Sequence, residues 1–262
     1  MTRPEIFYTY MQYPAPEPID FFVPEQKTIT TNTASRKYTN PHTYRLITKV
    51  NKYNRLYKNI PFVKAIYLCD GISFNASKET SDIDLFFVVE DGCIRRARFA
   101  SVCLFWILWI KRSLHNKAWK FDLIFYVTQS HSNLKHIRLS PEDPYIYHWL
   151  SHLIPIYNED QKHSIYRQNS RLYETFPNLP KDKHIIDLWI PITHGDTIYK
   201  KMGQYILWSK VRERIIGTIR SYIIKRKAHK RKDRIEDLII TTNMLKFHKD
   251  RRLEIAKAIH NK

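Results

Sequence analysis

The chain has 262 residues, of which 43% are apolar and 26% are charged, and this is the composition of a globular protein rather than of a disordered chain. The net charge is +19 and it is uneven, because residues 201–262 hold 18 Lys/Arg and only 6 Asp/Glu. Such an excess predicts a nucleic acid or another polyanion as partner. A lysine-rich background along the whole chain is the alternative explanation.

Cysteine usage and hydropathy predict the redox compartment of the protein and whether it contains a membrane span. The three cysteines, Cys69, Cys93 and Cys103, contain no CxxC pair, which argues against a disulfide framework or a zinc site and predicts a reducing, cytoplasmic compartment. The N-terminus lacks the layout of a signal peptide. The longest apolar run, residues 99–110, is shorter than the roughly 20 residues of a membrane span. We therefore expect a buried helix and no membrane partner.

Residues 1–40 are expected to form an extended arm. Five prolines, at positions 4, 14, 16, 18 and 24, prevent a continuous helix. The many aromatic residues in the same stretch are untypical of a fully solvated tail. We expect three parts in all: this Pro- and aromatic-rich arm, a core over residues 41–135, and a mainly helical C-terminal region with a basic end over residues 136–262.

The core region shows alternating helix and strand signals. Asn40-Pro41 is a helix start, an N-cap residue followed by proline at the first helical position, and Pro61 ends the helix. Residues 72–80 are expected to be a short helix or ordered loop after Gly71, and residues 94–114 a buried helix. Apolar runs rich in β-branched and aromatic residues predict strands. These strands are residues 62–69, 85–89 and 120–128.

The region after residue 135 is expected to be mainly helical. Predicted helices cover residues 145–153, 160–173, 199–232 and 250–260, and residues 154–157 could be a short strand. Residues 238–246 precede the last helix. The fold class is therefore α+β, with a small mixed sheet, flanking helices and a helical C-terminal region.

Ser81-Asp82-Ile83-Asp84 opens one predicted strand and is the candidate site. Alternate residues of a strand face the same side, so Asp82 and Asp84 are expected to point together. Two neighbouring carboxylates repel each other unless a cation lies between them, and hard divalent cations prefer carboxylate oxygens. Asp122 opens the next predicted strand. The alternative is that these aspartates are only solvated acids at strand starts.

A strand, a turn of small residues and then Ser81-Asp82-Ile83-Asp84 on the next strand resemble the nucleotidyltransferase superfamily that includes DNA polymerase β. Further stretches resemble a group of uncharacterised stand-alone bacterial nucleotidyltransferase-domain proteins, and that likeness covers roughly residues 45–250. Besides 81–86, these stretches are residues 60–66, 98–99, 155–157, 176–178 and 244–248.

The resemblance implies a metal-dependent transfer of a nucleoside monophosphate from a nucleoside triphosphate (NTP) to a hydroxyl acceptor. It implies that Asp82, Asp84 and Asp122 hold two Mg²⁺ or Mn²⁺ ions, with Asp122 at the attacking hydroxyl. The triphosphate would lie on the turn after the first strand. The nucleotide-binding residues implied are Gly71, Ser73 and Ser81.

One residue departs from the family pattern. Asp70 replaces the first glycine of the Gly-Ser or Gly-Gly pair, and an acid disfavours a triphosphate unless it points away or binds metal. The alternative function is a catalytically degenerate protein of the same fold that binds RNA or a ribonucleoprotein. A toxin or antitoxin enzyme is a third hypothesis. An Asp122 carboxylate more than about 8 Å from the other two would exclude a shared two-metal site.

Two further features concern the acceptor. Residues 225–232 contain six basic residues, Lys225, Arg226, Lys227, Lys230, Arg231 and Lys232. They either contact a phosphate backbone, which favours RNA as the acceptor, or complete a solvated helix end. The aromatic stripes Trp106/Trp109 and Trp208/Tyr222 are expected in the core, although exposed rings would be able to stack on bases.

Overall fold

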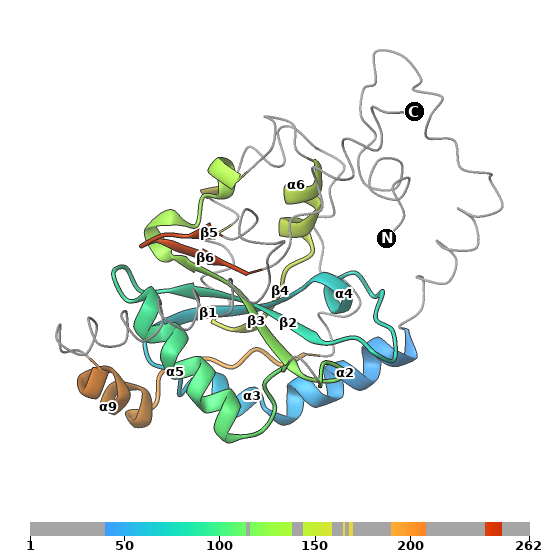
Figure 1. Ribbon diagram of the computed structural model, residues 1–262, viewed down its shortest axis with the longest axis horizontal. Helices are drawn as coiled ribbons and strands as arrows, with labels where there is room; N and C mark the ends of the chain where they lie inside the picture. The colour runs from blue at the N-terminus through green and yellow to red at the C-terminus, as the bar shows by residue number, and fades with distance from the viewer. Residues whose placement is uncertain are drawn as a thin grey trace, which may run out of the picture.

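The computed structural model describes residues 40–113, 116–137, 144–158, 165, 168–169, 190–207 and 239–247. These residues form an α+β fold around a six-stranded sheet of order β4-β1-β2-β3-β6-β5 (Figure 1). β2 and β3 are parallel, and the other neighbouring strands pair antiparallel. The predicted mixed sheet with flanking helices is therefore confirmed.

The strands come from both sides of residue 135. They are β1 (Val63–Cys69), β2 (Ile83–Val89), β3 (Phe121–Thr128), β4 (Ile154–Tyr157), β5 (Ile239–Ile240) and β6 (Met244–Lys246). The first four lie close to the strands expected from the sequence. The β5–β6 pair was not predicted, because two- and three-residue strands are too short to show an alternating pattern.

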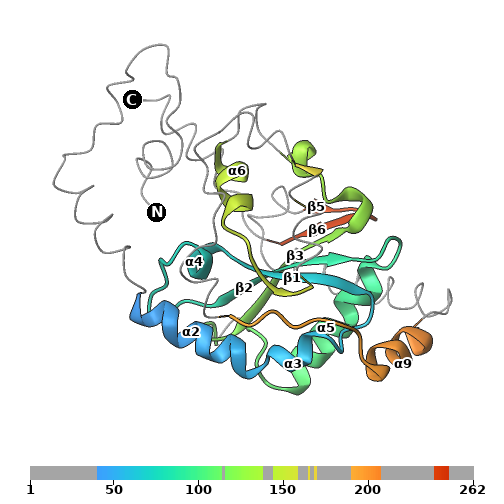
Figure 2. The same cartoon turned by 180° about the vertical axis from the view of Figure 1, so that it is seen from behind.

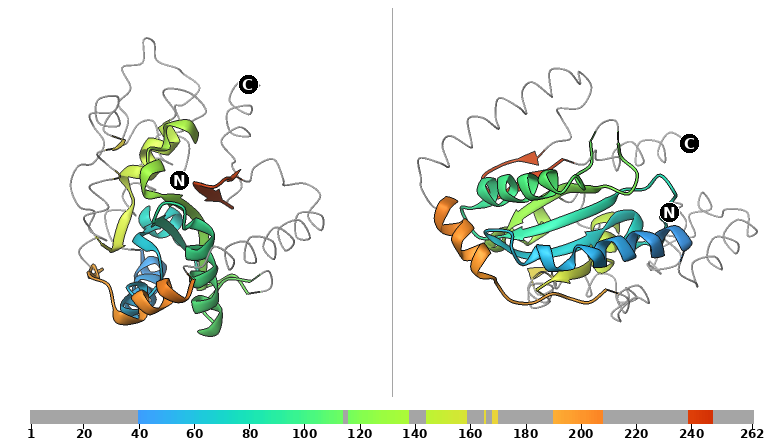
Figure 3. Two further views of the ribbon diagram at one scale, coloured as in Figure 1. Left: turned by 90° about the vertical axis from the view of Figure 1, so that its left-hand side faces the viewer. Right: turned by 90° about the horizontal axis from the view of Figure 1, so that it is seen from below.

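Helices cover both faces of the sheet. They are α2 (Pro41–Lys52), α3 (Asn54–Tyr57), the single turn α4 (Asp70–Ser73), α5 (Ile94–Ile107), α6 (Pro144–Ser151) and α9 (Ile198–Leu207), with short 3₁₀ turns at Gln129–His131 and Leu134–Ile137. Figures 2 and 3 show α2, α3 and α5 across one face and α6 on the other. The described residues include no helix that is both long and apolar enough to cross a bilayer.

The alternation of side chains along the strands explains the two layers. On β2, Ile83, Leu85 and Phe87 pack into the core cluster that contains the buried residues of α2 and α5. Phe86 and Val88 point the other way, into the cluster that contains α6. Both faces of the central strands pack into apolar clusters over most of their length. In the sequence these strands are therefore nearly continuous hydrophobic runs.

The start of α2 agrees with the sequence. The side chain of Asn40 accepts a hydrogen bond from the His42 amide at 2.9 Å, and proline follows at the first helical position. The Asn40 side chain also donates to the Ser77 carbonyl at 3.1 Å. This cap therefore ties the helix to the segment between β1 and β2.

Helix α5 corrects two predictions. It ends at Ile107 rather than at residue 114, because Trp109 adopts a left-handed conformation (φ 55°) and Lys111 then pairs with Phe121 beside β3. The helix is also not buried all round. Ile94, Ala97 and Phe105 lie in the core, whereas Trp106 and Ile107 are 67% and 64% exposed. The expectation that Trp106 and Trp109 belong to the core was wrong.

Several predicted elements lie outside the described residues. These are the arm at 1–39, nearly all of the helix at 160–173, the part of the long helix after Leu207 with its basic residues 225–232, and the last helix at 250–260. Trp208 and Tyr222 fall in the same category. The expected start of the long helix agrees with α9, which begins at Ile198.

Candidate metal centre

Three carboxylates meet where β2 and β3 begin. Asp84 and Asp122 are direct partners in the parallel register of the two strands, and Asp82 lies two residues before Asp84. Because side chains alternate along a strand, all three lie on the same face of the sheet. Their ligand oxygens lie within 4.8 Å of one another. The predicted triad is therefore assembled, well inside the separation that would have excluded a shared site.

The cluster could hold a metal ion. Three carboxylate oxygens suit a hard cation such as Mg²⁺ or Mn²⁺, and oxygens that share one Mg²⁺ lie up to about 4 Å apart. The upper limit on the distances in the cluster, 4.8 Å, is close to that value. All three residues are partly exposed, so an ion can enter from solvent and keep water ligands.

Arg112 neutralises part of this negative charge. Its Nε lies 3.0 Å from Asp82 Oδ2, and its Nη1 donates to Asp122 Oδ2. The guanidinium thus bridges the two outer members of the triad. Among the described residues Asp84 forms no such ion pair, and Arg112 acts on its charge through space.

The pKa of Asp84 reflects the several carboxylates that lie near it. Burial raises its pKa well above the ordinary value, and the charges of Asp70, Asp82 and Asp122 raise it further, whereas Arg112 opposes them. Among the described residues, Arg112 pairs with Asp82 and Asp122, and the guanidinium of Arg98 also interacts with the charge of Asp122. A divalent cation bound at the cluster would favour the charged form of Asp84.

Asp70, the departure from the family pattern, belongs to the same surroundings. It follows β1 directly, has a left-handed backbone (φ 55°) and forms the first residue of α4. Its Oδ1 accepts a hydrogen bond from Trp149 Nε1 of α6 at 3.2 Å. After burial, the charge of Asp70 is the largest influence that raises the pKa of Asp84. It therefore adds negative charge near the cluster rather than lying remote from it.

The three residues expected to bind nucleotide lie in the turns around the cluster. Ser73 is buried, and its hydroxyl donates to the Asp70 carbonyl at 3.0 Å. Ser81 accepts from the Lys78 amide at 2.8 Å and so closes the turn before β2. Gly71 has room for a side chain, since an added Cβ would meet only Ser77 Oγ, at 3.9 Å. Both hydroxyls are engaged with the backbone of their own turns.

Sequence reasoning missed Arg112. It lies ten residues before Asp122, beside β3, where its amide donates to the Phe121 carbonyl at 2.8 Å. Arg98 of α5 supports the same strand. It donates to the Leu123 carbonyl at 2.9 Å, and its guanidinium lies 3.7 Å from the centre of the Phe247 ring.

The basic residues at 225–232 lie outside the described residues, so their relation to the centre stays a prediction. What the structure brings together is the acidic triad, Asp70 and Arg112. Comparison of the chain with protein-family models, with curated proteins and with solved structures gave no match.

Proposed function

We propose that the protein is a metal-dependent nucleotidyltransferase that moves a nucleoside monophosphate from an NTP to a hydroxyl acceptor. The observation that carries this proposal is the meeting of Asp82, Asp84 and Asp122 at the start of two parallel strands. β1 precedes them antiparallel to β2, with the α4 turn between, and α5 connects β2 to β3. The resemblance noted in the sequence expects this order of elements and acids.

The reaction exchanges one bond at the α-phosphorus of the NTP for another. The acceptor hydroxyl oxygen forms a bond to the α-phosphorus, the bond from that phosphorus to the bridging oxygen breaks, and pyrophosphate leaves. Divalent ions held by Asp82, Asp84 and Asp122 would supply charge neutralisation at the attacking and leaving oxygens. The proton of the hydroxyl passes to the Asp122 carboxylate. Arg112, beside Asp122, holds that carboxylate in place.

The test is transfer of label from an α-labelled NTP in the presence of Mg²⁺ to a pool of acceptors that contains RNA. We expect labelling by the wild-type protein and its loss in Asp82→Ala and Asp84→Asn. Glu79→Ala is the matched control, because Glu79 is an exposed acid three residues before Asp82, and it should keep full labelling. Equal labelling by wild type and Asp82→Ala would falsify the assignment.

A second candidate function rests on Asp70. An additional acid at the first residue of α4, close enough to raise the pKa of Asp84, disfavours a triphosphate at this turn. This favours a catalytically degenerate protein that binds RNA or a ribonucleoprotein. Calorimetry with NTP and Mg²⁺ separates the two functions. Heat of NTP binding that grows in Asp70→Asn supports the enzyme, whereas salt-sensitive RNA binding without any NTP heat supports the binding module.

A further inference from the structure

Two tryptophans lie exposed at the end of α5. Trp106, near the end of α5, is 67% exposed, and Trp109, just after it, is 81% exposed. Their rings stack on each other, with centroids 6.4 Å apart and an angle of 22° between the planes. An exposed stacked pair of the largest aromatic side chain is unusual for a face that meets only water, and such faces mark binding sites.

Lys120 contacts this pair, and its charge acts in turn on Lys49 of α2. Lys120 Nζ donates to the Trp109 carbonyl at 2.5 Å, and Lys49 Nζ of α2 donates to the Trp119 carbonyl at 2.5 Å. Burial lowers the pKa of Lys49, and the charges of Lys120 and Lys52 lower it further. The Lys49 ammonium is therefore repelled by the other two, and among the described residues none of the three forms an ion pair with an acid. A polyanion would relieve this repulsion.

The pair is close to the carboxylate cluster along the chain. Trp109 is three residues before Arg112, whose guanidinium contacts Asp82 and Asp122. Three residues of extended chain span at most about 11 Å. Trp119 and Lys120 are connected to the same end of the sheet, because the Trp119 amide donates to the Ser81 carbonyl and the Ile83 amide to the Lys120 carbonyl. These hydrogen bonds place Trp119 and Lys120 beside the start of β2.

We propose that Trp106 and Trp109, with Lys49, Lys52 and Lys120, form a binding surface for single-stranded nucleic acid. Bases stack on the tryptophan rings while the lysines contact the phosphates, which is how sequence-tolerant single-strand binders work. A duplex cannot use the rings, because its bases are already stacked in pairs. A strand held on this surface is led toward the acidic cluster, so its terminal hydroxyl is the acceptor; that last step rests on the proposed nucleotidyltransferase function.

Binding is tested on the full chain without NTP and with the metal removed by EDTA. The probe is a short fluorescein-labelled RNA that forms no secondary structure, and the readout is fluorescence anisotropy. Trp109→Ala should weaken binding by about 5- to 150-fold, the loss of stacking on one base, and Trp109→Phe should retain most of it. Replacing both Lys49 and Lys120 by Gln should reduce the slope of log affinity against log salt by about 1.4.

The matched control is Tyr205→Ala. Tyr205 is an 86% exposed aromatic residue on α9, away from the proposed surface, and its loss should leave RNA affinity unchanged. The duplex of the same sequence should be insensitive to Trp109→Ala. The melting temperature of each variant shows that it is folded.

Three outcomes would overturn the proposal: equal RNA affinity for wild type and Trp109→Ala, equal loss in Tyr205→Ala, or sedimentation with phosphatidylserine vesicles that needs Trp109 in a protein that does not bind RNA. The last would identify a membrane-binding surface instead. Failure of the two proposals is distinguishable. RNA binding that depends on Trp109 without any transfer contradicts only the enzyme, and transfer to RNA that ignores Trp109→Ala contradicts only the binding surface.

Discussion

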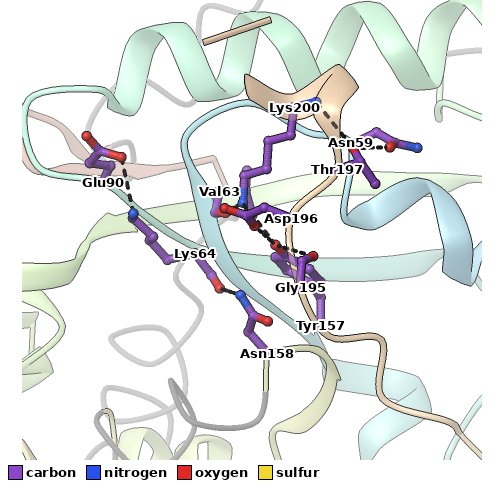
Figure 4. A network of polar contacts seen from close by, with 10 residues as sticks. All are labelled: Asn59, Val63, Lys64, Glu90, Tyr157, Asn158, Gly195, Asp196, Thr197 and Lys200. Carbon is purple, nitrogen blue, oxygen red and sulfur yellow. Dashed lines mark hydrogen bonds and ion pairs between the residues drawn. The ribbon is translucent and has the colours of Figure 1, made fainter. Parts of the chain in front are cut away.

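Two groups of charged side chains in this protein differ in how their charges are balanced. At the metal centre, Arg112 pairs with Asp82 and Asp122, while the charges of Asp70, Asp82 and Asp122 all raise the pKa of Asp84. Beside β1 and β4, the buried ammonium of Lys200 has a full set of partners (Figure 4). Lys200 is 1% exposed, and Nζ donates to the Val63 carbonyl at 2.6 Å, to Asp196 Oδ1 at 2.7 Å and to the Tyr157 hydroxyl at 2.9 Å.

The residues around Lys200 also form hydrogen bonds with one another. The Tyr157 hydroxyl also donates to Asp196 Oδ1, at 2.6 Å, and the Asn158 side chain donates to the Lys64 carbonyl at 2.7 Å. Every proton of the ammonium is used, and the charge is balanced by one carboxylate. Such a network joins the start of α9 to the edge of the sheet and leaves no unsatisfied group for a ligand.

The difference between the two groups separates a structural role from a functional one. A charge with all its partners in the chain stabilises the fold, whereas a cluster of like charges favours binding of a ligand of opposite charge. Replacing a member of the first group should cost stability. Replacing a member of the second should relieve repulsion and cost only ligand binding. The predictions below test this contrast.

The largest effect is expected at Lys200. Lys200→Met keeps the apolar stem but removes the ammonium, so the Val63 carbonyl and the Tyr157 hydroxyl lose a donor inside the protein. Asp196 is 41% exposed and is partly rehydrated, which reduces the loss to about 2–4 kcal/mol of unfolding free energy. Urea denaturation measures it. Lys201→Met, at the exposed neighbour, should change stability by no more than about 0.5 kcal/mol.

At the metal centre, loss of a charged side chain should cost metal binding but should not destabilise the metal-free protein. Mg²⁺ at a hundred times its dissociation constant should stabilise the wild-type protein by about 2.7 kcal/mol, and Asp84→Asn should abolish this gain. In EDTA, Asp84→Asn should be at least as stable as wild type, because it removes one of four mutually repelling charges. Thermal unfolding with and without the metal measures both effects. A clear loss of stability in EDTA would contradict the contrast.

A smaller effect is expected for Arg112. Its guanidinium competes with a metal ion for Asp82 and Asp122, so Arg112→Ala should bind Mn²⁺ more tightly. One charge about 4 Å away in a well-solvated site is worth about 1 kcal/mol, roughly fivefold in affinity. Arg112→Lys keeps the charge and should remain near the wild-type affinity. Titration calorimetry with Mn²⁺ distinguishes the variants, and weaker binding in Arg112→Ala would show that Arg112 assists the metal.

The smallest effect concerns pH. Burial alone would raise the pKa of Asp196, but the hydrogen bonds from Lys200 and Tyr157 and the charges of Lys200 and Lys64 outweigh it and lower that pKa below its ordinary 3.8. The stability that Asp196 contributes is therefore present above pH 3.8 and is lost as the pH falls through its folded-state pKa. Below about pH 4 the melting temperature of wild type should fall more steeply than that of Asp196→Asn. Parallel slopes would contradict the assignment.

Local patterns in the sequence determined much of the fold. The apolar runs that became β1, β2 and β3, the Asn40-Pro41 helix start and the shared face of Asp82 and Asp84 all follow from chain geometry within a few residues. These features depend on backbone sterics and side-chain alternation, which act between near neighbours. They were therefore available before any tertiary structure.

Only the tertiary structure decided the rest. The parallel register that sets Asp122 beside Asp84 needs the crossover through α5, and the bridge from Arg112 needs the chain to turn back along β3 at Trp109. Exposure of Trp106 and Trp109 depends on what packs against α5, which an apolar run cannot reveal. Contacts between residues far apart in the chain set each of these features, so composition and periodicity could name the aspartates but could not place the arginine, the lysines and the tryptophans around them.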